Sequence, residues 1–161
     1  NIYVSAGKGY GKTPLSAFDF ALKDAGVYNY NLIGLSSIIP VDSTIKVEKF
    51  HGSEEEYGHR LYVVKAEFRS REAGKFIGAA IGWYQLPDGR GVFVEHEEIG
   101  ETQSAVESDL KEDVKNSLSD LCQARSYQAD ENSFKMEMSI VPVTNSPACA
   151  LVLAVYRAEE W

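Results

Sequence analysis

The sequence predicts an α+β fold, a layered sandwich in which mostly antiparallel sheets pack together with helices outside. Segments with strand-like patterns outnumber the helical ones, and the two main helical patterns are well separated along the chain. A strong turn at residues 87–91 joins two strand-like segments, which should therefore pair antiparallel. At 161 residues, 44% of them hydrophobic, the chain is expected to form one domain, 1–161.

The first helix is expected after a short β-prone segment at residues 2–5 and a glycine-rich loop at residues 7–11. Thr13 suits the N-cap, Pro14 the first helical position and Gly26 the stop. Apolar residues at helical spacing predict the buried stripe, which consists of Leu15, Phe18, Leu22 and Ala25.

Asp19 is predicted to project on or beside this stripe, because it lies four residues after Leu15 and three before Leu22. A carboxylate at such a position is costly unless it is paired, hydrogen-bonded or faces a polar cavity. The position of Asp19 therefore needs an explanation.

Residues 31–40 form a short apolar run that predicts a buried strand, broken at Ser36 and Ser37 and closed by Pro40. On spacing alone, the two serines are strand-end residues that cap the backbone of the following turn. The alternative is that Ser37 is a site of backbone chemistry.

The middle of the chain alternates weakly over residues 41–58, and its acidic run at residues 54–56 is interpreted as a solvated loop. Strand patterns follow at residues 60–68, 74–86 and 92–97.

The strand at residues 92–97 is predicted to place Phe93, Glu95 and Glu97 on one face. The other face carries the alternate residues, Val92, Val94 and His96. The acidic face fits either the solvent side of an edge strand or a pocket in which one glutamate is a proton donor. A lone strand histidine is interpreted as a structural residue.

A second amphipathic helix is predicted from a capping box of Ser104 and Glu107 to about Ser126. Strand patterns follow at residues 134–143 and 148–156. The last of these is a near-continuous apolar run, so we expect a buried central strand.

The formal net charge of −8 would repel a nucleic-acid backbone and is easier to reconcile with a cationic small molecule. No stretch has the length of a membrane span and no signal-peptide pattern is seen, so a cytoplasmic protein without a membrane partner is expected. Cys122 and Cys149 lack the spacing of a metal site and are expected to be buried, reduced thiols.

Residues 6–13 come within one residue of the phosphate-binding loop Gly-x-x-x-x-Gly-Lys-Ser/Thr. Ala6 replaces the first glycine, Pro14 follows the Lys-Thr pair, and no later apolar strand ends in an aspartate suited to magnesium. Nucleotide binding therefore stays open only as an alternative.

Four segments share the order and spacing of one known family. They are Gly11-Lys-Thr-Pro-Leu-Ser-Ala-Phe-Asp-Phe-Ala-Leu22, Gly26, Asn31-Leu-Ile-Gly-Leu-Ser-Ser-Ile-Ile-Pro40 and Val94-Glu-His-Glu-Glu-Ile-Gly100. On these segments the chain resembles the pyruvoyl-dependent arginine decarboxylases, and the likeness covers almost the whole chain, in order.

The resemblance implies a proenzyme that cleaves itself between Ser36 and Ser37, giving a β chain of residues 1–36 and an α chain of residues 37–161. The Ser37 hydroxyl attacks the preceding carbonyl to form an ester, and β-elimination then frees the Ser36 carboxylate. The dehydroalanine left at position 37 tautomerises and loses ammonia to become a pyruvoyl group. By the same resemblance, Asn31 assists the cleavage by hydrogen-bonding the attacked carbonyl or its oxyanion.

The resemblance also implies decarboxylation of L-arginine to agmatine and CO2, a step of polyamine biosynthesis. The covalent pyruvoyl group from Ser37 is then the cofactor, with no metal and no pyridoxal phosphate. Glu95 matches the family's proton donor, and Asp19 matches a carboxylate that binds the substrate guanidinium. The rest of the implied substrate site consists of Leu22, Ile38 and the freed carboxylate of Ser36. Homotrimers, or pairs of trimers, with active sites between subunits are implied as well.

Two alternatives stay open at this point. One is a pyruvoyl enzyme of the same fold acting on histidine, aspartate or ornithine. The other is a non-catalytic or nucleotide-binding protein on the same scaffold.

Overall fold

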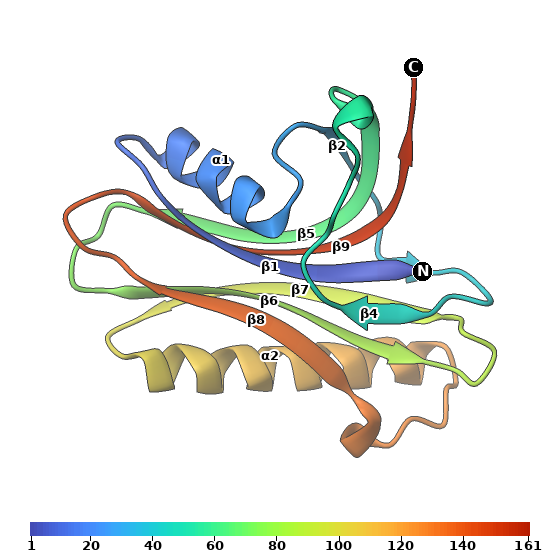
Figure 1. The fold of residues 1–161 in the computed structure, drawn as a ribbon. Helices are drawn as coiled ribbons and strands as arrows, with labels where there is room; N and C mark the ends of the chain where they lie inside the picture. The colour runs from blue at the N-terminus through green and yellow to red at the C-terminus, as the bar shows by residue number, and fades with distance from the viewer.

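The protein is built of four layers, helix, sheet, sheet and helix, in a computed structural model that describes all 161 residues (Figure 1). One sheet has the strand order β2-β5-β9-β1-β4 and the other has the order β3-β7-β6-β8. The strands are β1 (Ile2–Tyr10), β2 (Asn31–Gly34), β3 (Ile38–Ile39), β4 (Ile45–Val47), β5 (Arg60–Ser70), β6 (Phe76–Gln85), β7 (Gly91–Gly100), β8 (Lys135–Pro142) and β9 (Ala148–Glu159).

Two long helices cover the outer faces of the sheets: α1 (Pro14–Ala25) and α2 (Gln103–Ala124). All strand pairs are antiparallel except β1 with β4 and β2 with β5. The predicted α+β sandwich is therefore confirmed. Neither helix combines the length and the hydropathy that crossing a bilayer would require.

Helix α1 begins and ends where the sequence predicts. The Thr13 hydroxyl accepts from the backbone N–H of Ser16, and Gly26 ends the helix with a φ of 90°. The predicted stripe is partly wrong, because Leu15 is 68% exposed. Phe18 packs at the edge of the core, and the residues buried against the sheet are Ala17, Ala21, Leu22 and Ala25. Asp19 consequently lies on the exposed side of the helix and not beside its buried stripe.

The predicted glycine-rich loop is wrong, because Gly7 and Gly9 lie inside β1, where they pair with Leu151 and Cys149 of β9. A Cβ at Gly7 would lie 2.2 Å from a backbone oxygen of α1, and one at Gly9 would lie 2.1 Å from another. These glycines therefore let the helix approach the sheet. They do not form a loop that could surround a phosphate, which removes the argument for nucleotide binding.

We expect Gly9→Ala to lower the free energy of unfolding by about 2 kcal/mol or more, because backbone atoms of α1 must move to admit the methyl group. Gly34→Ala is the matched control, since nothing lies within 4 Å of its added Cβ. That variant should stay within about 0.5 kcal/mol of the wild type in urea unfolding. Equal effects of the two substitutions would contradict this account of the helix packing.

The predicted buried strand at residues 31–35 is instead an edge strand, β2, which pairs only with β5. Its four residues are exposed or half-buried, because no element continues the sheet beyond them. The predicted central strand is confirmed in β9, which is buried from Ala148 to Val155. The predicted hairpin of β6 and β7 is also confirmed.

Helix α2 has its N-cap two residues before the predicted Ser104, because the hydroxyl of Thr102 accepts a hydrogen bond from the Ala105 N–H. Its buried stripe consists of Val106, Leu110, Val114, Leu118 and Cys122. Both cysteines are free and buried, as predicted. The acidic run Glu54–Glu56 forms one exposed turn of 3-10 helix.

Candidate functional site

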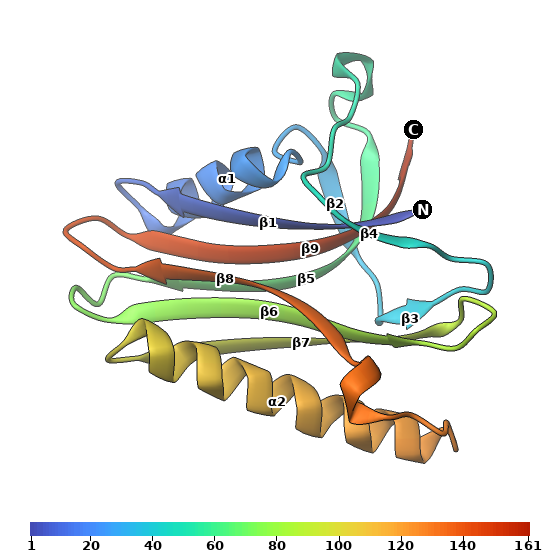
Figure 2. The same ribbon diagram turned by 60° about the horizontal axis from the view of Figure 1, so that its bottom comes forward.

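Ser37 lies where the chain crosses from one sheet to the other. It follows β2 of the five-stranded sheet and precedes β3 of the four-stranded sheet (Figure 2). Its φ is +76°, a left-handed backbone conformation that is strained for a residue with a Cβ. The scissile junction implied by the family resemblance is therefore a point of local backbone strain.

Two groups from β7 hold Ser37 in this conformation. The Ser37 hydroxyl donates a hydrogen bond of 2.6 Å to Oε1 of Glu95. The backbone N–H of Phe93 donates a hydrogen bond of 2.8 Å to the Ser37 carbonyl. Ser37 and Glu95, two predicted site residues that are distant in sequence, are thus in direct contact.

The faces of β7 are arranged as predicted. Phe93 packs into the core between the two sheets, and Val92 and Val94 pack against α2. Glu95 follows Phe93 on the inner face and is half-buried. His96 faces α2, where its Nε2 lies 2.7 Å from the Ser117 hydroxyl.

The pKa of Glu95 is raised above that of an ordinary glutamate, mainly because burial penalises its charged form. The negative charge of Glu97 acts in the same direction, and the hydrogen bond from Ser37 partly opposes both. A carboxyl with a raised pKa keeps its proton to higher pH and can donate it to a reacting carbon. The geometry therefore fits a general acid next to residue 37.

Tyr156 is a site residue that sequence reasoning missed. Its hydroxyl donates a hydrogen bond of 2.8 Å to the carbonyl of Ile38, and its ring meets that of Phe93 edge-on with centroids 6.1 Å apart. The sequence shows only a tyrosine at the end of an apolar run, and nothing in that pattern indicates what its hydroxyl contacts.

Asn31 does not reach the Ser36–Ser37 bond of its own chain. Its side-chain amide donates 2.8 Å to the carbonyl of Gly58. Because the strand between Asn31 and Leu35 is extended, their Cα atoms are about 13 Å apart. The bond that Asn31 is expected to assist therefore lies beyond the reach of its side chain.

Asp19 and Leu22 also lie apart from Ser37 within one chain. Both belong to α1, which packs on the outer face of the five-stranded sheet (Figure 1). Asp19 is exposed and makes no hydrogen bond or ion pair with Ser37 or Glu95. Leu22 is buried against the sheet, whereas Ile38 is 51% exposed.

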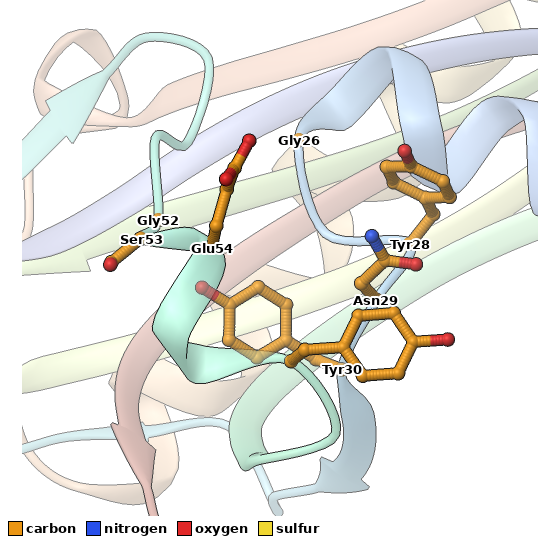
Figure 3. A pocket seen from close by; sticks show the side chains of 8 residues that line it. Gly26, Tyr28, Asn29, Tyr30, Gly52, Ser53 and Glu54 are labelled. Atoms are coloured by element: carbon orange, nitrogen blue, oxygen red, sulfur yellow. The ribbon is translucent and has the colours of Figure 1, made fainter.

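Two defined cavities lie elsewhere. One of about 430 Å³ lies between the end of α1 and the acidic turn, and Figure 3 shows its polar and aromatic lining of Gly26, Tyr28, Asn29, Tyr30, Gly52, Ser53, Glu54 and Tyr57. Another of about 540 Å³ lies at the start of α1. Neither includes Ser37 or Glu95, and no three His, Cys, Asp or Glu side chains are placed to hold a metal ion.

The residues present at position 37 and around it fit a group made from serine. The hydroxyl that would attack the preceding carbonyl is oriented by Glu95, and the backbone is strained at the same residue. No other serine of the chain combines a left-handed backbone with a carboxyl partner whose pKa is raised.

Comparison with known proteins points to the same family that the sequence motifs resemble. The sequence model of the family described as pyruvoyl-dependent arginine decarboxylase matches residues 1–160. The chain is similar to a protein of Thermoplasma volcanium named pyruvoyl-dependent arginine decarboxylase, with 32% identity over 99% of this chain and 89% of the relative. One from Halobacterium salinarum is 30% identical over 96% of this chain and 92% of the relative. The chain therefore belongs to the pyruvoyl-dependent arginine decarboxylase family.

Proposed function

We propose that this protein decarboxylates L-arginine to agmatine and CO2, using a covalent pyruvoyl group that it makes from its own Ser37. The observation that carries the proposal is the contact between the strained Ser37 and the half-buried Glu95. The membership of the family, whose relatives carry arginine in their names, supports the substrate.

The first reaction is cleavage of the chain. The Ser37 oxygen attacks the Ser36 carbonyl, the C–N bond breaks and an ester replaces the amide. Loss of the Ser37 α-proton then expels the Ser36 carboxylate, and hydrolysis of the remaining residue releases ammonia. Breaking the chain frees residue 37 from the strain at φ +76°, which favours the cut state. The products are residues 1–36 and 37–161.

The second reaction is decarboxylation. When present, the pyruvoyl group supplies an electron sink for the charge that is left as CO2 departs. Glu95 holds the proton that the substrate carbon takes up, and the buried ring of Phe93 limits water on the same strand face. The N–H of Phe93 fixes the carbonyl of residue 37, so the reactive end of the chain keeps its orientation toward Glu95.

We further propose that Asp19, Leu22 and Asn31 serve the site of a neighbouring protomer. Asn31 is about 13 Å from Leu35 along an extended strand, too far to contact its own scissile bond. Asp19 lies exposed on a helix outside the five-stranded sheet. Sites between subunits of a homotrimer, or of a pair of trimers, would bring these residues to Ser37. The exposed Leu15 and Ile38 are consistent with such contacts.

Asp19→Asn is expected to raise the KM for arginine about 10- to 100-fold, because a guanidinium loses a charged bidentate partner. Self-cleavage should be unaffected. Asp24→Asn is the matched control on the same helix, since Asp24 only pairs with the exposed Lys49 and accepts from the Lys8 N–H. Steady-state kinetics with arginine would contradict the role of Asp19 if both variants kept the wild-type KM.

Release of CO2 from single amino acids tests the proposed substrate. Arginine should be consumed with one agmatine formed per CO2, and ornithine, histidine and aspartate should react at least about 100-fold more slowly, because they lack the guanidinium. Faster turnover of another amino acid would favour the alternative of a different pyruvoyl decarboxylase.

A further inference from the structure

Tyr156 stands where the regular pairing of β9 breaks. Two consecutive residues of β5, Tyr62 and Val63, pair with Arg157 and Val155 of β9. Tyr156 is therefore the extra residue of a β-bulge. The bulge leaves the alternation of β9 intact, because Val152 and Ala154 also face the core between the two sheets. Here the ring of Tyr156 packs on the core between the two sheets.

From this position Tyr156 reaches across to the other sheet. Its hydroxyl holds the Ile38 carbonyl at 2.8 Å, while the N–H of Phe93 holds the Ser37 carbonyl at 2.8 Å. Two successive carbonyls after the Ser36–Ser37 bond are thus fixed by donors from different sheets. The rings of Phe93 and Tyr156 also pack against each other, which fixes the two donors relative to one another.

The segment that these donors hold is otherwise weakly attached. β3 consists of only Ile38 and Ile39, lies at an edge of its sheet and pairs with β7 alone. In the uncut chain it is also tethered through Ser36 to β2. Cleavage removes that tether, and chain ends with few contacts fray.

We propose that Tyr156 is a positioning residue that keeps position 37 beside Glu95 once the chain has been cut. The inference rests on the proposed self-cleavage. The hydroxyl is suited to the task because burial, and then the charge of Glu95, raise the pKa of Tyr156, so it stays a hydrogen-bond donor throughout the working pH range.

Tyr156→Phe tests the hydroxyl alone, because the ring that packs on Phe93 remains. Tyr10→Phe is the matched control: its hydroxyl also bridges the two sheets, donating 2.6 Å to the carbonyl of Pro142, but far from Ser37 in the fold. We expect both variants to cleave fully. In the cleaved proteins, only Tyr156→Phe should lower kcat, by about three- to tenfold, which is the effect expected from one lost hydrogen bond. Its KM should change less than about twofold.

Hydrogen exchange separates positioning after cleavage from a general structural role. Peptides that start near residue 38 should exchange faster in cleaved Tyr156→Phe than in cleaved wild type. In the uncuttable Ser37→Ala background, Tyr156→Phe should change their exchange little, because the tether through Ser36 remains.

Three results would overturn the inference. They are equal kcat values for Tyr156→Phe and Tyr10→Phe, equally faster exchange in the cut and the uncut background, and failure of Tyr156→Phe to cleave when wild type does. A wild-type protein that stays uncut would instead contradict the proposed function, and with it the premise of this inference.

Discussion

Replacing Ser37 by alanine is expected to leave the protein as one uncut chain of 161 residues without decarboxylase activity. Alanine has no oxygen to attack the preceding carbonyl and none to leave in the elimination, so neither the cut nor the reactive group can form. Intact mass should show a single species, and release of CO2 from arginine should fall to the background rate. This is the largest effect that we expect from one substitution.

Ser36→Ala is the matched control for this experiment. Only the carbonyl of residue 36 takes part in the cleavage, and its side chain is exposed. The variant should still give two fragments, the second of them lighter by one ammonia than a chain with a free N-terminal serine. If Ser37→Ala were cut, or if Ser36→Ala alone blocked cleavage, the assignment of the nucleophile would be wrong.

Glu95→Gln is expected to reduce kcat about 100- to 10,000-fold, the usual contribution of a positioned general acid. The amide is close in shape to the carboxyl and can still accept the hydrogen bond from Ser37, so cleavage should proceed. The reduction of kcat would therefore arise in the decarboxylation step and not in the cleavage. Fragment masses and steady-state rates, measured on the same preparation, distinguish the two reactions.

The pH dependence gives a second measurement of the same role. A proton donor is active below its pKa, so kcat should fall as the pH rises through the raised pKa of Glu95. Glu97→Gln removes one cause of that raised pKa and is the control on the same strand. Its kcat should be nearly normal at low pH, with the decline shifted to lower pH by less than about one unit, because solvent screens the exposed Glu97. Normal turnover by Glu95→Gln would dismiss Glu95 as the donor.

Much of the scaffold could be predicted from local patterns. Thr13, Pro14 and Gly26 define α1 through backbone requirements that operate within a few residues. The alternation of Phe93 and Val94 likewise identified the two faces of β7. Such features depend on neighbours in sequence, so they are visible in the sequence itself.

The predictions that were wrong or incomplete concern contacts between segments that are distant in sequence. Gly7 and Gly9 look like a loop because glycine is typical of loops, yet they lie in a strand under α1. The run ending at Ser37 looks like a buried strand, but its place at the sheet edge depends on which strands lie beside it. Tyr156 continues the inner face of β9, but its partner, the Ile38 carbonyl, belongs to the other sheet, which no periodicity indicates.

The predicted site residues fall into two groups: those that are in contact within one chain and those that are not. The contact of Ser37 with Glu95 joins residues that the family resemblance had already paired, and the structure supplies their distance of 2.6 Å. Asp19, Leu22 and Asn31 are not brought to Ser37 within one chain, so their roles remain predictions about an assembly of protomers.

The most direct test of the central claim is the mass of the purified protein after incubation with arginine and borohydride. We predict two fragments, residues 1–36 and residues 37–161, with the second carrying the added mass of reduced agmatine or arginine at position 37. That result would demonstrate the cut, the reactive carbonyl and the substrate together. A single uncut chain, or a second fragment that begins with an unmodified serine and gains no mass, would contradict the claim.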